Sequence, residues 1–306
     1  MRYYRRVIHI RAEDSPNVRL ALEQRARGEE PTGKTILPGV LSWADYLHRR
    51  ATWDKIRQCV GLDGQFYEGS EVLMFPPEWL SRAEGIADKL IGKPRRALGG
   101  GCDPAEGGDE TAMAAVDQFG LIELVSFKTP DTSVIPSNCV AFMKKWSIPP
   151  EKFCFDRGGG GYQHVCELRN RGYKVRSVGF GESLLLDIKS GKYQVNPKRE
   201  HREERYVYLN RRAEMFGLIR QLLDPVNDGW GIPAQYQELR RQLAPIPLTY
   251  DKEGRLFLLP KHNPKDPDDP RTLKALIGCS PDQADSVALA VFGMVHKFHQ
   301  AKAGVA

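Results

Sequence analysis

Two aspartates lie close together near the C-terminal end of the sequence, in the stretch Gly278-Cys-Ser-Pro-Asp-Gln-Ala-Asp285. Ser280 and Pro281 have the residue types of an N-cap and a first helical turn, which predicts that a helix with apolar later residues begins here. Asp282 and Asp285 are three positions apart and therefore share one face of that helix. Because carboxylates near a helix N-terminus interact favourably with the helix dipole, capping is the alternative interpretation.

Two further aspartates each end a short strand-like run. Asp103 follows a glycine-rich run whose small residues allow close backbone approach, and Asp156 follows a phenylalanine-containing run. Acids on three separate elements favour a site for a hard cation such as Mg²⁺ or Mn²⁺. Two such ions, about 4 Å apart, can cleave a phosphodiester by activating the attacking water and stabilising the leaving 3′ oxygen. We expect Asp103 to bridge both ions and Asp156 to hold one. Asp282 and Asp285 would complete the other side.

Basic residues near these acids are candidate contacts to DNA phosphates. Arg157 directly follows the second strand-end acid, Arg211 and Arg212 begin an amphipathic helical segment, and Lys261 precedes the last acids. The alternative for each residue is solvated surface charge or a structural ion pair, for example with Glu214.

Composition sets the general class of the protein. The chain has 306 residues, of which 41% are hydrophobic and 27% are charged, with a net charge of +6. These values predict a soluble protein of one or two domains and are compatible with a polyanionic partner. Six cysteines without CxxC spacing indicate neither a zinc ribbon nor a disulfide framework. Because no apolar run approaches about 20 residues, we expect no membrane span and a cytoplasmic location.

The segment from Gly28 to Thr35 matches the P-loop pattern that binds nucleotide phosphates. A working P-loop follows a strand and opens a helix, whereas this one follows polar helix-like sequence and soon meets Pro38 and Gly39. We therefore expect no nucleotide site here.

The order of predicted elements indicates an α/β domain with a mixed sheet. Three strands over residues 96–128 form an antiparallel set, and alternating helices and strands follow to residue 178. Before them, residues 41–80 are rich in aromatic side chains, which we expect to pack a small subdomain instead of stacking on bases. The proline-broken basic stretch after Gly92 predicts the domain boundary, which gives domains at 1–92 and 93–306.

Four segments in this order resemble the large terminase subunit of tailed bacteriophages. They are Gly101-Cys-Asp-Pro-Ala105, Phe155-Asp156 with the glycines after it, Leu209-Asn-Arg-Arg-Ala-Glu-Met215 and Ser280-Pro-Asp-Gln-Ala-Asp-Ser286. The resemblance implies that residues 93–306 form an RNase H-like nuclease domain of the RuvC/integrase type, flanked by helices. It implies a mostly helical remnant of the ATPase C-terminal region and linker subdomain at 1–92.

The same resemblance implies a function and partners. It implies an endonuclease, dependent on Mg²⁺ or Mn²⁺, that cleaves double-stranded viral DNA during genome packaging in the host cytoplasm. The portal protein and the small terminase subunit are the implied assembly partners. ATPase activity is not expected from this chain alone, because the family's Walker motifs lie upstream of the region it resembles.

Two alternatives and one open choice remain at the level of sequence. The chain could be a RuvC-like junction resolvase or transposase nuclease, or a catalytically silent DNA-binding or assembly fragment of a truncated terminase. Either Asp282 or Asp285 could be the essential ligand of the last pair, and we favour Asp282 because it lies nearer the start of the helix.

Overall fold

The computed structural model describes residues 9–52, 58, 60–65, 73–105, 110–182, 208–251, 255–263, 265–266 and 269–296. The chain divides into two compact units, Met1–Ser70 and Glu71–Ala306. This division lies earlier than the boundary expected between residues 92 and 93. The reason is packing: Met74, Phe75 and Leu80 belong to the hydrophobic core of the second unit.

The described part of the first unit contains η1 (Ala12–Asp14), α1 (Pro16–Ala26) and α2 (Trp43–Thr52). Trp43 and Tyr46 stack in its small core with ring centroids 5.6 Å apart. The aromatic residues of the expected subdomain are therefore divided between the two units, because Phe75 packs in the second. Trp53, Phe66 and Tyr67 lie outside the described residues.

The P-loop-like segment lacks the structure that the pattern requires. Residues 28–35 follow helix α1, and the next described helix begins only at Trp43. The side chain of buried Asn17 holds the following loop, because its Oδ1 accepts the backbone N–H groups of Ile36 (2.7 Å) and Leu37 (2.9 Å). The segment thus follows a helix instead of a strand, as the sequence predicts.

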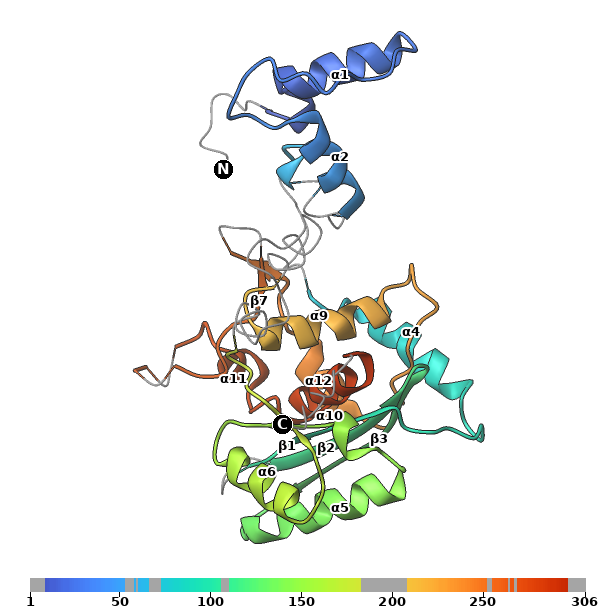
Figure 1. The fold of residues 1–306 in the computed structure, drawn as a ribbon, viewed down its shortest axis with the longest axis vertical. Helices are drawn as coiled ribbons and strands as arrows, with labels where there is room; N and C mark the ends of the chain where they lie inside the picture. The colour runs from blue at the N-terminus through green and yellow to red at the C-terminus, as the bar shows by residue number, and fades with distance from the viewer. Residues whose placement is uncertain are drawn as a thin grey trace, which may run out of the picture. The chain divides into compact units, whose positions relative to one another are not determined.

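The second unit contains a five-stranded sheet with helices on both faces (Figure 1), and a separate two-stranded sheet. Its described elements are α4 (Pro77–Asp88), β1 (Gly99–Asp103), β2 (Glu110–Asp117), β3 (Gly120–Lys128), η2 (Thr132–Val134), α5 (Ile135–Lys145), η3 (Pro150–Lys152), β4 (Phe153–Asp156), α6 (Gly161–Asn170), β5 (Arg176–Val178), α9 (Arg211–Leu223), α10 (Gln237–Leu243), β6 (Thr249–Tyr250), β7 (Leu256–Phe257), α11 (Leu273–Ile277) and α12 (Asp282–Val295).

The sheet has the order β3-β2-β1-β4-β5. Strand β2 is antiparallel to β1 and to β3, whereas β4 is parallel to β1 and β5 is parallel to β4. This arrangement confirms the expected RNase H-like mixed sheet. The short strands β6 and β7 pair with each other in antiparallel orientation.

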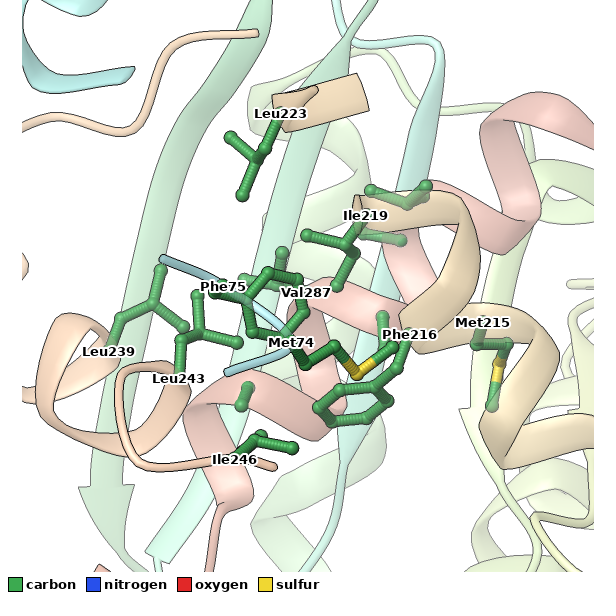
Figure 2. Packing of buried hydrophobic residues seen from close by; sticks show 14 of the residues in the cluster. Met74, Phe75, Met215, Phe216, Ile219, Leu223, Leu239, Leu243, Ile246 and Val287 are labelled. Atoms are coloured by element: carbon green, nitrogen blue, oxygen red, sulfur yellow. The ribbon is translucent and has the colours of Figure 1, made fainter. Parts of the chain in front are cut away.

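Alternation along the strands produces two hydrophobic cores. On β4, Phe153 and Phe155 point to the core shared with α5 and α6, and Cys154 between them joins the core shared with α9, α10 and α12. Figure 2 shows part of the second core, in which Phe216 and Ile219 of α9 pack near Val287 of α12.

Glycines allow helix α12 to lie directly against β1. A Cβ added at Gly101 would come within 2.3 Å of the Ser286 carbonyl oxygen, and one at Gly99 within 2.3 Å of the Ala290 oxygen. From the other side, a Cβ at Gly293 would come within 2.4 Å of the Lys152 oxygen. The close approach that the glycine run predicts is therefore an approach to α12, and it brings the acids of β1 and α12 together.

The sequence patterns do not predict every local feature of the second unit. Helices α10 and α11 were not predicted, because each is short and has a weak periodic pattern. The described part of the 261–270 segment is also partly buried. Its Asp269 is buried and accepts hydrogen bonds from Asn263 and from Arg271.

Candidate metal-dependent nuclease site

The pleat of the sheet places two of the four acids on the α12 face. On β1, Cys102 points toward α5 and α6, so its neighbour Asp103 points the opposite way. On β4 the same alternation from Phe155 turns Asp156 toward α12. Since β1 and β4 are adjacent parallel strands, their C-terminal ends bring both acids to one edge of the sheet. Asp103 itself is 4% exposed.

The start of α12 supplies the other two acids. Asp282 Oδ2 accepts the backbone N–H of Glu110 at 3.1 Å, and its Oδ1 accepts the hydroxyl of Ser280. Ser280 was expected to be the N-cap, but Pro281 occupies that position and the Ser280 hydroxyl is bound to the carboxylate instead. The backbone N–H of Ala284 is satisfied from α10, by Oε1 of Gln242 at 3.0 Å. A helix distant in sequence therefore contacts the first turn of α12, between the two acids.

Asp285 is fully buried and bound to an arginine from α9. Nη2 of Arg212 donates to Oδ1 at 2.8 Å and to Oδ2 at 2.9 Å, and Nε donates to Oδ1 at 3.2 Å. The guanidinium carbon of Arg212 lies 5.4 Å from the ring centroid of Phe180 and 5.6 Å from that of Phe216. A charge in this position is held both by hydrogen bonds and by aromatic rings.

Lys261 brings a second cation to the acids. Its Nζ is 3.2 Å from Asp282 Oδ1, 3.6 Å from Asp103 Oδ2 and 3.6 Å from Asp285 Oδ2. These distances place one ammonium group against acids from both β1 and α12. The Lys261 backbone is fixed as well, because its carbonyl oxygen accepts the N–H of Lys274 at 3.1 Å.

Burial and mutual repulsion change the acidity of the cluster. Burial raises the pKa of Asp103 well above its ordinary value; Lys261 opposes this shift and the neighbouring aspartates add to it. Burial also raises the pKa of Asp156, against the N–H of Gly158, which donates to its Oδ1 at 3.1 Å. Burial alone would lower the pKa of Lys261, but the attraction of Asp103, Asp285 and Asp282 raises it above its ordinary value. These shifts favour the protonated form of Asp103 and Asp156 and the charged form of Lys261.

The chemistry of these donors suits a hard cation, since all are carboxylate oxygens. Asp103 Oδ2 is buried and accepts no hydrogen bond within the described part of the chain, which leaves it available to a ligand. In the described residues, however, no three acidic, histidine or cysteine side chains are close enough to hold one ion as they stand. Lys261 lies between them, so an ion would require its displacement and a closer approach of the acids.

The predicted DNA contacts have different environments. Arg157 is half exposed, and its Nη2 is 2.6 Å from Glu182 Oε1. Arg211 is buried and paired with Glu214, which agrees with the alternative expected from the sequence. Arg212 and Lys261 contact the acids of the site instead of an open surface. Of these four cations, Arg157 has the most exposed side chain, and it directly follows Asp156 in sequence.

Some residues of the site have no clear signal in the sequence. Gln242 and Phe180 lie far from every acid along the chain and match no motif, and Ser280 has the residue type of a cap. Arg212 was named from the sequence, but as a candidate DNA contact at the start of an amphipathic helical segment. Its partner could not be identified, since the Arg212–Asp285 pair spans 73 positions.

Comparisons with known proteins identify the fold. No protein-family model matches this sequence, and no curated protein matches it. The nuclease domain of the large terminase subunit gp2 of bacterial virus Sf6 superposes with a TM-score of 0.55 and 17% identity, covering 72% of this chain and 98% of that one. A mutant of the same Sf6 domain solved with manganese gives 0.54 and 16% identity, covering 72% and 99%.

Another mutant of the Sf6 protein, solved with calcium, gives a TM-score of 0.54 and 17% identity, covering 72% of this chain and 99% of that chain. The chain thus has the fold of large terminase nuclease domains, which confirms at the level of the fold the resemblance seen in the sequence.

Among the residues that the structure describes, no helix is long and apolar enough to cross a membrane.

Proposed function

We propose that this chain is a metal-dependent endonuclease of the large terminase type, which hydrolyses phosphodiester bonds of double-stranded DNA. The observation that carries the proposal is the meeting of four carboxylates from β1, β4 and α12 at one edge of the sheet. Asp103 Oδ2 is buried there and accepts no hydrogen bond from the described residues. Buried acids that repel one another reduce stability, and a cation ligand gives this arrangement a purpose. The nuclease fold of the Sf6 neighbours supports the same function.

Each acid has a defined role in this proposal. Asp103, Asp156 and Asp282 would hold Mg²⁺ or Mn²⁺, with Asp285 completing the ligand set. When bound, ions of this kind activate water for attack and neutralise charge on the scissile phosphate. Without them, Lys261 partly neutralises the acids, and its ammonium has to leave before a divalent ion can take its place. Arg157 is half exposed and directly follows Asp156 in sequence, and it would contact the DNA backbone in place of Glu182.

The wider roles follow from the terminase proposal. The DNA would be the viral genome during packaging, the portal protein and the small terminase subunit would be partners, and the host cytoplasm would be the compartment. Two ions are proposed because acids approach from opposite sides, β1 and β4 on one side and α12 on the other.

Cleavage of supercoiled plasmid with Mn²⁺ or Mg²⁺ tests the function. The wild-type chain should nick and linearise the plasmid, and Asp103→Asn should slow cleavage at least about a thousandfold, equivalent to about 4 kcal/mol of barrier. Asp131→Asn is the matched control, because Asp131 caps η2 on the surface of the same unit and should leave the rate unchanged. Full activity in Asp103→Asn would remove this site from the mechanism.

Two further measurements separate the alternatives. Mn²⁺ should raise the melting temperature of the wild-type chain and not that of Asp103→Asn, because binding to the folded state alone stabilises it. No stabilisation and no cleavage would favour a catalytically silent DNA-binding fragment. Much faster cleavage of branched DNA than of linear duplex would favour a junction resolvase or transposase nuclease.

A further inference from the structure

The contact between Arg212 and Asp285 has the features of a support for the site, and this inference rests on the proposed function. Asp285 accepts three hydrogen bonds from one guanidinium group. A carboxylate held at both oxygens cannot rotate freely, so its remaining lone pairs point in fixed directions. Lys261, 3.6 Å from Oδ2, marks the side that stays open to a cation.

The guanidinium is itself held on several sides. Phe180 and Phe216 contribute aromatic rings near it, and the backbone N–H of Arg212 donates to the Phe180 carbonyl oxygen at 3.0 Å. The adjacent backbone N–H of Arg211 donates to the backbone carbonyl oxygen of Glu182 at 2.9 Å. The start of α9 is thus fastened to the turn that follows β5, and the same turn pairs with exposed Arg157 through Glu182.

The start of α9 is also well defined locally. Asn210 caps it, with Oδ1 accepting the N–H of Ala213 at 2.9 Å. Since the backbone around Arg212 is fixed by this cap and by the turn after β5, the guanidinium reaches Asp285 from a rigid base. Supports of this kind set the orientation of the groups that they contact.

We infer that Arg212 is a positioning residue, which fixes the Asp285 carboxylate for divalent-cation binding and remains in place when the cation binds. Lysine cannot replace it, because an ammonium group lacks the planar fork that spans both carboxylate oxygens and packs against the rings. Arg212 contacts neither DNA nor the reacting atoms in this account and acts only through Asp285.

The test compares two conservative substitutions in the same helix. Arg212→Lys keeps the charge and loses the fork. Arg220→Lys is the matched control, because Arg220 lies on α9, is 4.6 Å from the Trp79 ring centroid and donates to the Met74 carbonyl oxygen, away from the acids. Mn²⁺ affinity is measured by calorimetry on the whole chain. We expect Arg212→Lys to weaken binding about 10- to 100-fold, as for other outer contacts of metal ligands, and Arg220→Lys to change it less than about twofold.

A second readout separates positioning from general stability. In plasmid cleavage, Arg212→Lys should raise the Mn²⁺ concentration needed for half-maximal rate and leave the apparent KM for DNA unchanged. Phe180→Leu covers the case in which Arg212→Lys does not fold: it removes one ring beside the guanidinium from a half-buried position. It should weaken Mn²⁺ binding about threefold, a smaller effect because the three hydrogen bonds remain.

Each outcome decides the inference. Mn²⁺ affinity within about twofold of wild type in folded Arg212→Lys, or in Phe180→Leu where Arg212→Lys does not fold, would overturn the positioning role and leave the nuclease function intact. Equal losses in Arg212→Lys and Arg220→Lys would also overturn it, because the effect would then belong to the helix. A wild-type chain that neither binds Mn²⁺ nor cleaves DNA would overturn the proposed function and this inference with it.

Discussion

The two sides of the acid cluster neutralise charge in different ways. On the α9 side, Arg212 is buried and makes three hydrogen bonds to one carboxylate. On the side of the 261–270 segment, the Lys261 side chain is 30% exposed and shares one ammonium among three acids at 3.2 to 3.6 Å. We infer that Arg212 is a permanent partner of the acids, whereas Lys261 can be displaced by a metal ion. The acids can therefore be neutralised without a metal and still bind one.

The largest expected contrast is in stability without metal. Arg212→Ala leaves Asp285 buried without its main partner and should cost about 3–5 kcal/mol of unfolding free energy. Lys261→Ala should cost less than about 1 kcal/mol, because its side chain is partly exposed and Asp103 can take up a proton in compensation. Chemical denaturation with EDTA present gives both values. Equal losses would show that the two sides do not differ.

The next contrast is in metal affinity. Lys261→Ala should bind Mn²⁺ about tenfold more tightly, about 1.4 kcal/mol, because no ammonium group has to be displaced. Lys265→Ala is the control, since Lys265 is exposed in the same segment. Calorimetric titration measures the change. Weaker binding in Lys261→Ala would show that the lysine assists the ion, contrary to the comparison drawn here.

A pH effect of intermediate size follows from the acids themselves. The pKa of Asp103 is raised in the folded state from the ordinary 3.8. At pH values between the ordinary and the raised pKa, the folded chain therefore holds more protons than the unfolded chain. This acid's stabilising contribution is complete below the ordinary pKa and is lost as pH rises through the raised one. The pKa of Asp156 is raised as well, so its contribution to stability changes with pH in the same direction.

Asp103→Asn, which cannot ionise, should therefore gain stability relative to wild type as the pH of a metal-free solution rises from about 4 to about 8. The gain should be about 1.4 kcal/mol for each unit by which the pKa is raised. Thermal unfolding across this range measures it. A difference that does not change with pH would show that Asp103 titrates normally.

The smallest effect concerns DNA binding at the exposed edge of the site. Arg157→Ala should weaken binding to duplex DNA about threefold and reduce the salt dependence by about one phosphate contact. Arg171→Ala is the control, because Arg171 is similarly exposed and likewise pairs with a glutamate, Glu167 on α6. Fluorescence anisotropy at several salt concentrations distinguishes them. Equal effects would mean that the contribution of Arg157 is only general charge.

Local signals in the sequence were enough for the strands and for the candidate acids. Asp103 and Asp156 end runs with clear strand character, and the β-sheet pleat then turns both toward α12. Gly99 and Gly101 predicted that another segment packs closely against their strand, but the sequence could not identify that segment as α12. Which backbone a glycine meets depends on the complete fold.

The supports of the acids could not be predicted for a related reason. Arg212 was expected at a DNA surface because charge alone does not show whether a side chain points outward. Its burial follows from the turn after β5 and from Phe216, which are organised by tertiary packing. Ser280 was expected to cap α12, but the chain satisfies that helix from Gln242 and leaves the serine for Asp282.

A crystal structure of the chain with Mn²⁺, with the ions located by anomalous scattering, tests the central claim most directly. The account predicts metal density among Asp103, Asp156, Asp282 and Asp285, the Lys261 ammonium moved away, and Arg212 still bound to both oxygens of Asp285. Absence of metal at these acids, or a structure in which Arg212 releases Asp285 while Lys261 stays in place, would contradict it.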